Sequence, residues 1–283
     1  MNLGLFLPIF TAMTIARVTT PDQLRDAYQS VLDRIANAAA KSGRRPEDVL
    51  LVAVTKYAAP DQIRQLVDMG QMDLGESRVQ QLEKRVASLS EFLSRKRQLG
   101  SASTREDVDI TKAATHVRWH MIGHLQRNKA KQVINLVDLT HSVDSLRLAE
   151  ELHNIGAKRD KPIDILLQVN ASGETTKSGV AIPAVIHLAE QIDSMLNLRL
   201  RGLMTMAPKT DDEGLVRATF QRTYEVFKEV QKVGIAGKYF TALSMGMSND
   251  FELAIECGAN VVRVGSALFG DPEPSEADGD EIE

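Results

Sequence analysis

The sequence contains almost no cysteine, with Cys257 as the one thiol among 283 residues. A single cysteine excludes an intramolecular disulfide framework and suits a reducing compartment such as the cytosol. Charge of neither sign dominates, and the net charge of −4 argues against a general nucleic-acid binder. With 43% hydrophobic and 25% charged residues, the composition is that of a globular protein. It excludes collagen, coiled coil and disorder as descriptions of the whole chain.

The two ends of the chain differ from the part between them. Residues 1–18 form an apolar leader whose first fifteen residues contain no Lys or Arg, and Pro8 interrupts the apolar run. This leader lacks the basic start of a secretory signal and is too short to span a bilayer. We therefore expect a flexible extension, with membrane anchoring as the alternative. Residues 271–283 hold seven of the 38 acidic residues, which predicts a disordered acidic tail.

Residues 19–270 are interpreted as one domain in which short apolar runs alternate with segments of helical period. Thr20 and Pro21 are typical of a helix start, and Gly43 is typical of its end. Residues 94–109 are expected to be an irregular exposed excursion. The predicted strands are residues 50–56, 72–76, 117–123, 138–143, 164–170, 198–207, 239–246 and 260–266.

Eight such strands alternating with helices predict an α/β fold, namely a closed (β/α)8 TIM barrel with an extra N-terminal helix. The alternative is an open doubly wound sheet. That fold commonly carries a G-x-G-x-x-G phosphate fingerprint after its first strand, and Lys56 stands there instead. The barrel is therefore the favoured architecture, and its reacting groups are expected at the carboxyl ends of the strands.

Lys56 ends the first predicted strand, after the apolar run LLVAVT. We expect its amine to lie over the dry mouth of the barrel, where desolvation favours the free amine that forms Schiff bases. The alternative is a lysine that extends from the strand end into solvent. The residue alone does not separate these two interpretations.

The turns after the last two predicted strands indicate a phosphate site. In SMGMSND (244–250), Ser248 is expected to cap the following helix, and Gly246 would let backbone N–H groups approach a ligand. Gly265 and Ser266 open a second helical turn. Two adjacent helix N-termini after the seventh and eighth strands are typical of the phosphate cradle of a barrel. The alternative is a pair of ordinary capped turns.

Arg263 lies two positions before Gly265, so both are expected on the same face of the last strand. Beside a pyridine ring, an arginine would donate to the ring nitrogen and disfavour its protonation, which makes a poor electron sink. The alternative is a buried ion pair, for instance with Glu76. His120 and His141 are expected to pack in the core or to line the same pocket, and no metal site is predicted.

Seven motifs, in the same order over residues 20–270, resemble those of the pyridoxal phosphate homeostasis protein family, whose members look like the barrel domain of alanine racemase. In this family an asparagine is typical where Ser77 stands here. The motifs are VAVTK (52–56), GESRVQ (75–80), WHMIGHLQRNK (119–129), QVNASGETTKSG (168–179), RGLMTMAP (201–208), LSMGMSND (243–250) and VRVGSALFG (262–270).

The resemblance implies that Lys56 holds pyridoxal 5′-phosphate (PLP) as an internal aldimine and that Arg263 faces the pyridine nitrogen. It also implies intracellular buffering or delivery of PLP by a non-enzymatic, monomeric, cytoplasmic protein, with PLP-dependent apo-enzymes as conceivable recipients and with neither nucleic acid nor membrane as a partner. The phosphate would be held around Ser244, Gly246, Met247, Ser248, Gly265 and Ser266.

The main alternative is a PLP-dependent racemase for a small amino acid. A two-base racemase needs an acid/base group on the opposite face of the cofactor. In alanine racemase a tyrosine fills this role with the help of a C-terminal domain, whereas thirteen acidic and proline-containing residues follow Gly270 here. We therefore expect a carrier. A Schiff-base aldolase and a scaffold for client enzymes are further alternatives.

Overall fold

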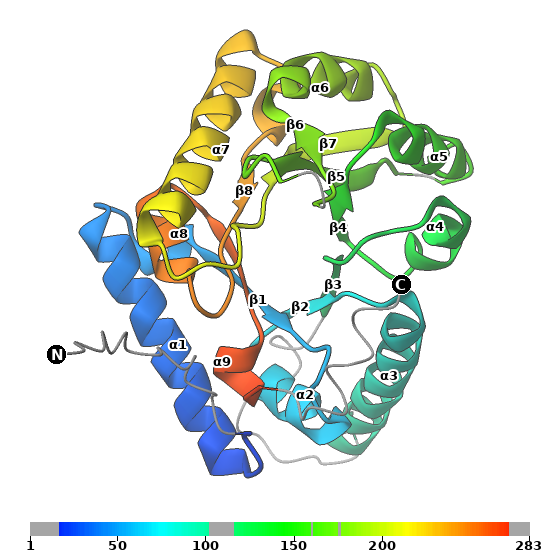
Figure 1. Ribbon diagram of the computed structural model, residues 1–283. Helices are drawn as coiled ribbons and strands as arrows, with labels where there is room; N and C mark the ends of the chain where they lie inside the picture. Colours follow the sequence, from blue (N-terminus) through cyan, green and yellow to red (C-terminus); the bar gives the residue numbers. More distant parts are fainter. Residues whose placement is uncertain (1–16, 102–115, 160, 175–176, 272–283) are drawn as a thin grey trace, which may run out of the picture.

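The computed structural model describes residues 17–101, 116–159, 161–174 and 177–271. Eight parallel strands form a closed ring with helices around it (Figure 1). Their order is β4-β3-β2-β1-β9-β8-β7-β5, and pairing between β5 and β4 closes the barrel. The strands are β1 (Leu50–Val54), β2 (Asp73–Glu76), β3 (Arg118–Met121), β4 (Leu139–Val143), β5 (Ile163–Asn170), β7 (Leu198–Met204), β8 (Ala242–Ser244) and β9 (Val261–Val264).

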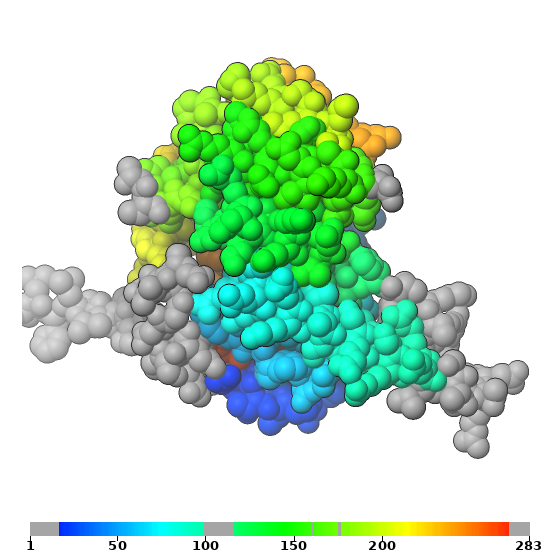
Figure 2. All heavy atoms as spheres, turned by 90° about the vertical axis from the view of Figure 1, so that its right-hand side faces the viewer, coloured from blue at the N-terminus to red at the C-terminus, as the bar shows by residue number. Residues whose placement is uncertain are grey.

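The predicted (β/α)8 barrel is therefore confirmed. A two-residue strand, β6 (Val180–Ala181), adds to β5 outside the ring. Helices α3, α4 and α5 lie side by side along one outer face of the barrel (Figures 1 and 2). The helices are α1 (Pro21–Lys41), α2 (Pro60–Asp68), α3 (Val79–Ser101), α4 (Arg127–Val133), α5 (Leu146–Gly156), α6 (Val185–Asp193), α7 (Glu213–Val233), α8 (Phe251–Glu256) and α9 (Ser266–Phe269).

The extra N-terminal helix is α1, and its start is specified locally. The Thr20 hydroxyl accepts a hydrogen bond from the Gln23 N–H, and the Gln23 side chain accepts one from the Thr20 N–H, so the two residues form a capping box. Val18, which was predicted to belong to the leader, donates its N–H to Phe269 O (3.1 Å) and belongs to the folded body. Residues 1–16 of the predicted leader and 272–283 of the predicted tail lie outside the described residues.

Several predicted strands are shorter in the structure, and two segments differ in kind. Residues 94–101, predicted to be irregular, are the last turns of α3, because SRKRQL consists mostly of good helix formers. The rest of that excursion, residues 102–109, lies outside the described residues. The strand predicted at 239–246 shortens to β8, since Gly237–Tyr239 forms a 3-10 turn before it.

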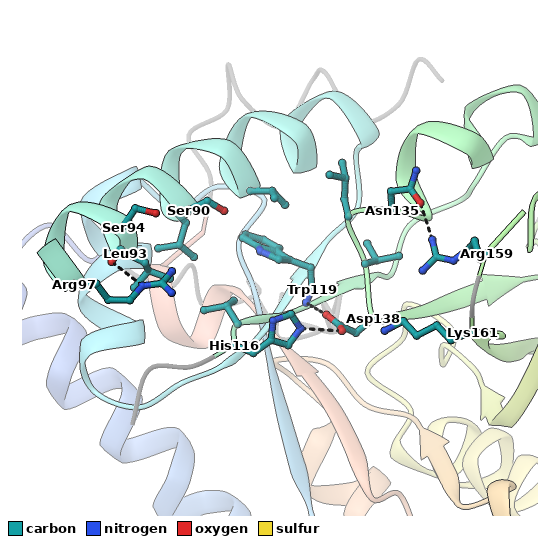
Figure 3. A pocket seen from close by; sticks show the side chains of 15 residues that line it. Ser90, Leu93, Ser94, Arg97, His116, Trp119, Asn135, Asp138, Arg159 and Lys161 are labelled. Carbon is teal, nitrogen blue, oxygen red and sulfur yellow. Dashed lines mark hydrogen bonds and ion pairs between the residues drawn. The ribbon is translucent and has the colours of Figure 1, made fainter. Parts of the chain in front are cut away.

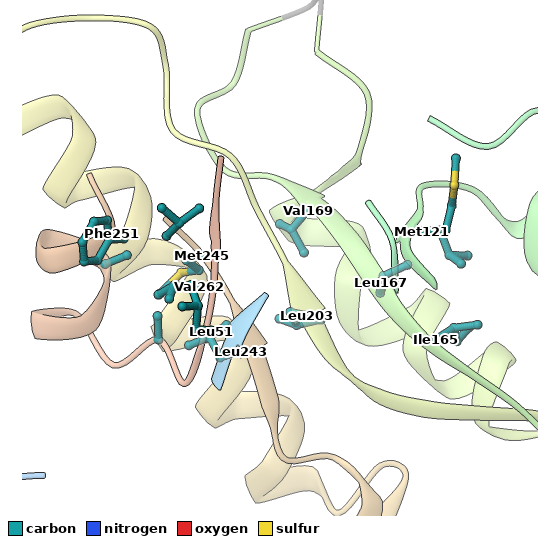
Figure 4. Packing of buried hydrophobic residues seen from close by; sticks show 14 of the residues in the cluster. Leu51, Met121, Ile165, Leu167, Val169, Leu203, Leu243, Met245, Phe251 and Val262 are labelled. Atoms are coloured by element: carbon teal, nitrogen blue, oxygen red, sulfur yellow. The ribbon is translucent and has the colours of Figure 1, made fainter. Parts of the chain in front are cut away.

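Alternation along the strands separates two buried environments. Leu51, Leu203 and Val262 belong to the large apolar cluster between barrel and helices (Figure 4). Residues of the opposite parity, such as Val52 and its register partner Arg263, face the barrel interior, where polar side chains are also buried. No helix within the described ranges has the length and apolar character needed to cross a membrane.

Candidate cofactor site

Lys56 lies at the carboxyl end of β1, in a turn rather than in the strand. The strand ends at Val54, two residues earlier than predicted, and the main-chain N–H of Ala58 donates to Thr55 O (2.8 Å) to close the turn. The Lys56 side chain is partly buried, and its Nζ lies 4.6 Å from the centroid of the Tyr57 ring. Lys56 is thus placed at the carboxyl end of the barrel, directly after β1.

Arg85, on α3, stabilises this turn through hydrogen bonds to its main chain. Its guanidinium donates to the main-chain oxygens of Lys56 (3.1 Å) and Ala58 (3.2 Å), and also to Thr55 O. The same guanidinium forms an ion pair with Glu76, which is fully buried. Burial lowers the pKa of Arg85, and the charge of Glu76 opposes that shift. The alternative pairing of Glu76 with Arg263 is therefore wrong, and Arg85 was missed because a single arginine on a helix carries no sequence signal.

Arg263 is buried in the barrel interior, with 3% of its surface exposed. Its Nη1 donates to Ser244 Oγ (2.5 Å) and its Nη2 donates to Thr205 O (2.9 Å), and both acceptors are uncharged. Burial lowers the pKa of Arg263 to about 10, while the charge of Asp250 acts in the opposite direction. The guanidinium is therefore a cation at neutral pH.

Ser248 joins the two turns that were predicted to form a phosphate cradle. Its Oγ accepts hydrogen bonds from the N–H groups of Gly265 (3.1 Å) and Ala267 (3.2 Å), at the start of α9. The prediction that Ser248 caps the helix that follows it is therefore wrong. Asp250 is the N-cap of α8, and it lies directly before that helix whereas Ser248 lies two residues further away. Two donors at the start of α9 thus converge on a single oxygen.

Gly246 is required for the packing of the turn between β8 and α8. Its φ is +89°, and a Cβ there would lie 2.7 Å from Phe251 Cα. The next residue, Met247, donates its N–H to Asp250 Oδ1 (2.6 Å) and has a half-exposed side chain. Both residues shape the turn between β8 and α8.

Gly265 brings the α9 turn close to the end of β1. A Cβ on Gly265 would lie 3.3 Å from Val54 Cβ, two residues before Lys56. Ser266 is the first residue of α9 and is partly exposed. The structure therefore places the predicted lysine and the predicted phosphate-binding turn on adjacent strands, β1 and β9.

A line of buried polar side chains runs across the barrel interior to Arg263, and we name it the interior chain. It includes both histidines that were predicted to pack in the core or to line the pocket. Consecutive members are joined by hydrogen bonds of 3.1, 2.9, 3.0 and 2.5 Å. The members of the interior chain are, in order, Asp73, His120, His141, Ser244 and Arg263.

A cavity of about 460 Å³ lies elsewhere, outside the barrel, between α3 and the segments that precede β3, β4 and β5 (Figure 3). At its edge, Asp138 accepts hydrogen bonds from the His116 ring (3.0 Å) and from the Trp119 N–H (3.1 Å). The predicted cofactor-binding residues do not line this cavity. It lies at the end of the barrel where the strands begin.

Comparison with known proteins defines first the class and then the family. Residues 84–273 match the family model for the N-terminal domain of alanine racemase, which together with the barrel defines an alanine racemase-like barrel protein. A pyridoxal phosphate homeostasis protein from Aquifex aeolicus is 35% identical over 244 residues, covering 85% of this chain and 95% of that protein. The chain belongs to the pyridoxal phosphate homeostasis protein family.

Solved structures agree with this assignment. A protein from Bifidobacterium adolescentis, described as unknown, has a TM-score of 0.76 at 35% identity, covering 90% of this chain and 99% of that one. PipY from Synechococcus elongatus, solved with PLP bound, has a TM-score of 0.67 at 30% identity, covering 83% of this chain and 100% of that one. The sequence resemblance and the fold prediction are thereby confirmed.

Proposed function

We propose that this protein binds PLP at the carboxyl end of the barrel and serves in intracellular PLP homeostasis, holding and delivering the cofactor without substantial catalysis. The observation that carries the proposal is Arg263, a buried guanidinium that donates to two uncharged oxygens. The family assignment and the structure of PipY with PLP bound support the choice of ligand.

A buried cation is stabilised when an electron-rich group faces it. Ser244 and Thr205 occupy two of the five N–H groups of Arg263, and three are left to donate. We assign one of these to the pyridine nitrogen of PLP. Because a guanidinium keeps its protons near neutral pH, it would leave that nitrogen unprotonated. A ring in this state withdraws electrons weakly, which suits a carrier better than a catalyst.

Lys56 is the residue that we propose to hold the aldehyde group of PLP. When bound, PLP supplies an aldehyde, and a primary amine condenses with an aldehyde to form a C=N bond with release of one water. The contacts of Arg85 with the main chain of this turn fix the point from which the Lys56 side chain extends. The Lys56 side chain therefore extends from a fixed main-chain position at the carboxyl end of the barrel.

The phosphate group is assigned to the turn at the start of α9. The N–H groups of Gly265 and Ala267 already converge on Ser248 Oγ, whose hydroxyl hydrogen can donate in turn. Gly246 and Met247 shape the adjacent turn, and Ser244 anchors Arg263. The residues present thus fit PLP, and Ser248, Gly265 and Ser266 would hold its phosphate.

A carrier role is supported by the state of the buried titratable groups. A racemase needs a free acid/base group opposite its lysine. Asp73, His120 and His141 in the barrel interior are instead hydrogen-bonded to one another.

We further propose that the protein is a cytosolic monomer and that PLP-dependent apo-enzymes receive the cofactor. Size-exclusion chromatography with light scattering tests whether the molar mass is that of a monomer. The activity that an apo-enzyme regains when it is mixed with the PLP-loaded protein tests delivery.

Borohydride reduction tests the covalent part of the proposal. After incubation with PLP, reduction followed by peptide mapping is expected to find the added mass on Lys56. Lys56→Arg keeps the charge and should abolish the trapped product, whereas Lys41→Arg, at an exposed position on α1, should not. Trapping on another lysine, or none, would contradict the proposal. Racemisation of alanine that Lys56→Arg abolishes would show an enzyme instead of a carrier.

A further inference from the structure

The interior chain connects the two ends of the barrel. Asp73 is the first residue of β2, at the amino end of the strands, and it forms an ion pair with Arg118, whose side chain is 48% exposed. The interior chain then crosses the barrel through two imidazole rings whose centroids lie 5.1 Å apart. It ends at Arg263, where we place the pyridine ring. The half-exposed Arg118 is thus linked to the proposed site through buried groups.

The direction of each hydrogen bond in this chain follows from its two ends. Burial alone would raise the pKa of Asp73, but hydrogen bonds from His120 and Arg118 lower it below its usual value, so the carboxylate is ionised. An ionised carboxylate only accepts, and therefore His120 Nε2 carries a hydrogen. At the opposite end, Arg263 only donates, and therefore Ser244 Oγ accepts from it.

The middle of the chain then has one consistent arrangement when both rings are neutral. His120 Nδ1 must accept, so His141 Nε2 carries the hydrogen of the bond between the two rings. His141 Nδ1 is then an acceptor, and Ser244 donates its hydroxyl hydrogen to it. Burial lowers the pKa of His141 well below its usual value, and the positive charge of Arg263 acts in the same direction, which agrees with a neutral ring.

We propose that His120 and His141 are positioning residues for Arg263: Asp73 holds both rings in the Nε2–H tautomer, so that His141 Nδ1 accepts the hydroxyl hydrogen of Ser244 and fixes the Ser244 oxygen that aims the guanidinium at the cofactor. The reverse arrangement, with His141 donating to Ser244, would require His120 to donate from both nitrogens and so to carry a charge. The role toward PLP rests on the proposed function, whereas the tautomers are a property of the protein alone.

Nitrogen-15 NMR of histidine-labelled protein without PLP tests the tautomers directly, since tautomers are assigned by spectroscopy and not by heavy-atom positions. At pH 7, His120 and His141 are both expected to show a protonated Nε2 and an unprotonated Nδ1. His120→Asn and His141→Asn assign the signals among the six histidines. An Nδ1–H tautomer at His141, or a charged ring at His120, would overturn the proposal.

PLP affinity and the visible spectrum of the bound cofactor test the positioning role. His141→Leu removes the acceptor for Ser244 and is expected to weaken PLP binding about threefold to tenfold, the effect of one hydrogen bond. His141→Asn, which keeps an oxygen near the position of Nδ1, should restore most of the affinity and the spectrum. Equal effects of the two substitutions would mean that the ring only fills space, and would overturn the proposal.

Ser244→Ala, alone and combined with His141→Leu, provides a second test of the link. Because Ser244 is the link to Arg263, His141→Leu should weaken PLP binding no further once Ser244 is alanine. If the losses of PLP affinity in the two single variants added up in the double variant, the proposed link from His141 to Arg263 through Ser244 would be wrong. Failure of PLP to bind the unmodified protein would overturn the proposed function and leave the NMR result standing, so the two failures are distinguishable.

Discussion

The two ends of the barrel differ in how their buried charged side chains are paired. At the amino end, acidic side chains form ion pairs with arginines of the protein: Asp73 with Arg118, and Asp164 with Arg199 and Arg201. At the carboxyl end, Arg85 is likewise paired with Glu76, but among the described residues the buried guanidinium of Arg263 donates to neutral oxygens. A buried charge that is already paired destabilises the fold when its partner is removed, whereas a buried cation bonded to neutral groups is ready for an electron-rich ligand.

Replacing Arg85 by methionine is expected to have the largest effect. It removes the clamp on the Lys56 turn and leaves Glu76 buried without its cation, which lowers the free energy of unfolding by about 3–5 kcal/mol. Arg118→Met should cost less, because the Arg118 side chain is half-exposed and Asp73 keeps the hydrogen bond from His120. Urea unfolding measures both.

The comparison of the two ends predicts a further difference between these variants. Arg85→Met should also weaken PLP binding, since the lysine turn loses its support, and Arg118→Met should affect binding far less. Adding Glu76→Gln to Arg85→Met should recover part of the stability but not the affinity for PLP. An Arg118 variant that is the less stable of the two would contradict the contrast between the ends.

Gly246→Ala is expected to follow in size. A side chain at positive φ costs about 1–2 kcal/mol, and overlap with Phe251 adds about 1–3 kcal/mol. Gly70 is the matched position at the amino end, because its φ is +97° and a Cβ there would meet nothing within 4 Å. Gly70→Ala should therefore show only the first cost. Equal unfolding midpoints for the two variants would show that the turn before α8 is not tightly packed.

The acid sensitivity of the interior chain comes next. His141 has a lowered pKa in the folded protein, so the unfolded chain binds a proton more readily. Its contribution to stability is therefore present above about pH 6.5 and is lost as the pH falls toward the folded value, by at most about 1.4 kcal/mol per pH unit. Asp73, whose pKa is also lowered, adds a loss below about pH 3.8.

Urea unfolding at pH 7, 6 and 5 measures this dependence. His141→Asn removes the titrating ring, so its free energy of unfolding should fall less steeply over this range than that of the unmodified protein. His187→Asn, in which a histidine on α6 is replaced, serves as the control and should retain the original slope. Parallel curves for the unmodified protein and His141→Asn would show that the buried ring does not carry the acid sensitivity.

The sequence predicts the barrel well because its signal is local. Apolar runs such as LLVAV (50–54) and helix-start signals such as Thr20 with Pro21 act over a few residues. Strand ends are less well predicted, since Lys56 follows β1 in a turn that the distant Arg85 stabilises. Pairing across the barrel depends on closure of the ring, which strand patterns do not encode residue by residue.

The same distinction applies to the candidate site. Lys56, Arg263 and the two glycine-containing turns stand at strand ends, where the barrel rule finds them. Ser248 was assigned to the wrong helix, because its partners Gly265 and Ala267 follow a different strand. The hydrogen bond between His120 and His141 joins residues on neighbouring strands, and no spacing in the sequence predicts it.

The smallest effect is expected at the cavity near the amino end. The His116 ring is 69% exposed and bonds Asp138, so His116→Gln should change the free energy of unfolding by less than about 1 kcal/mol. It should leave PLP affinity and the borohydride-trapped product unchanged, because the cavity lies at the opposite end of the strands from Lys56. Titration of PLP into this variant makes the test. If His116→Gln lowered the affinity for PLP, the cofactor would bind at the amino end, where the charges are already paired. The proposed difference between the two ends would then be wrong.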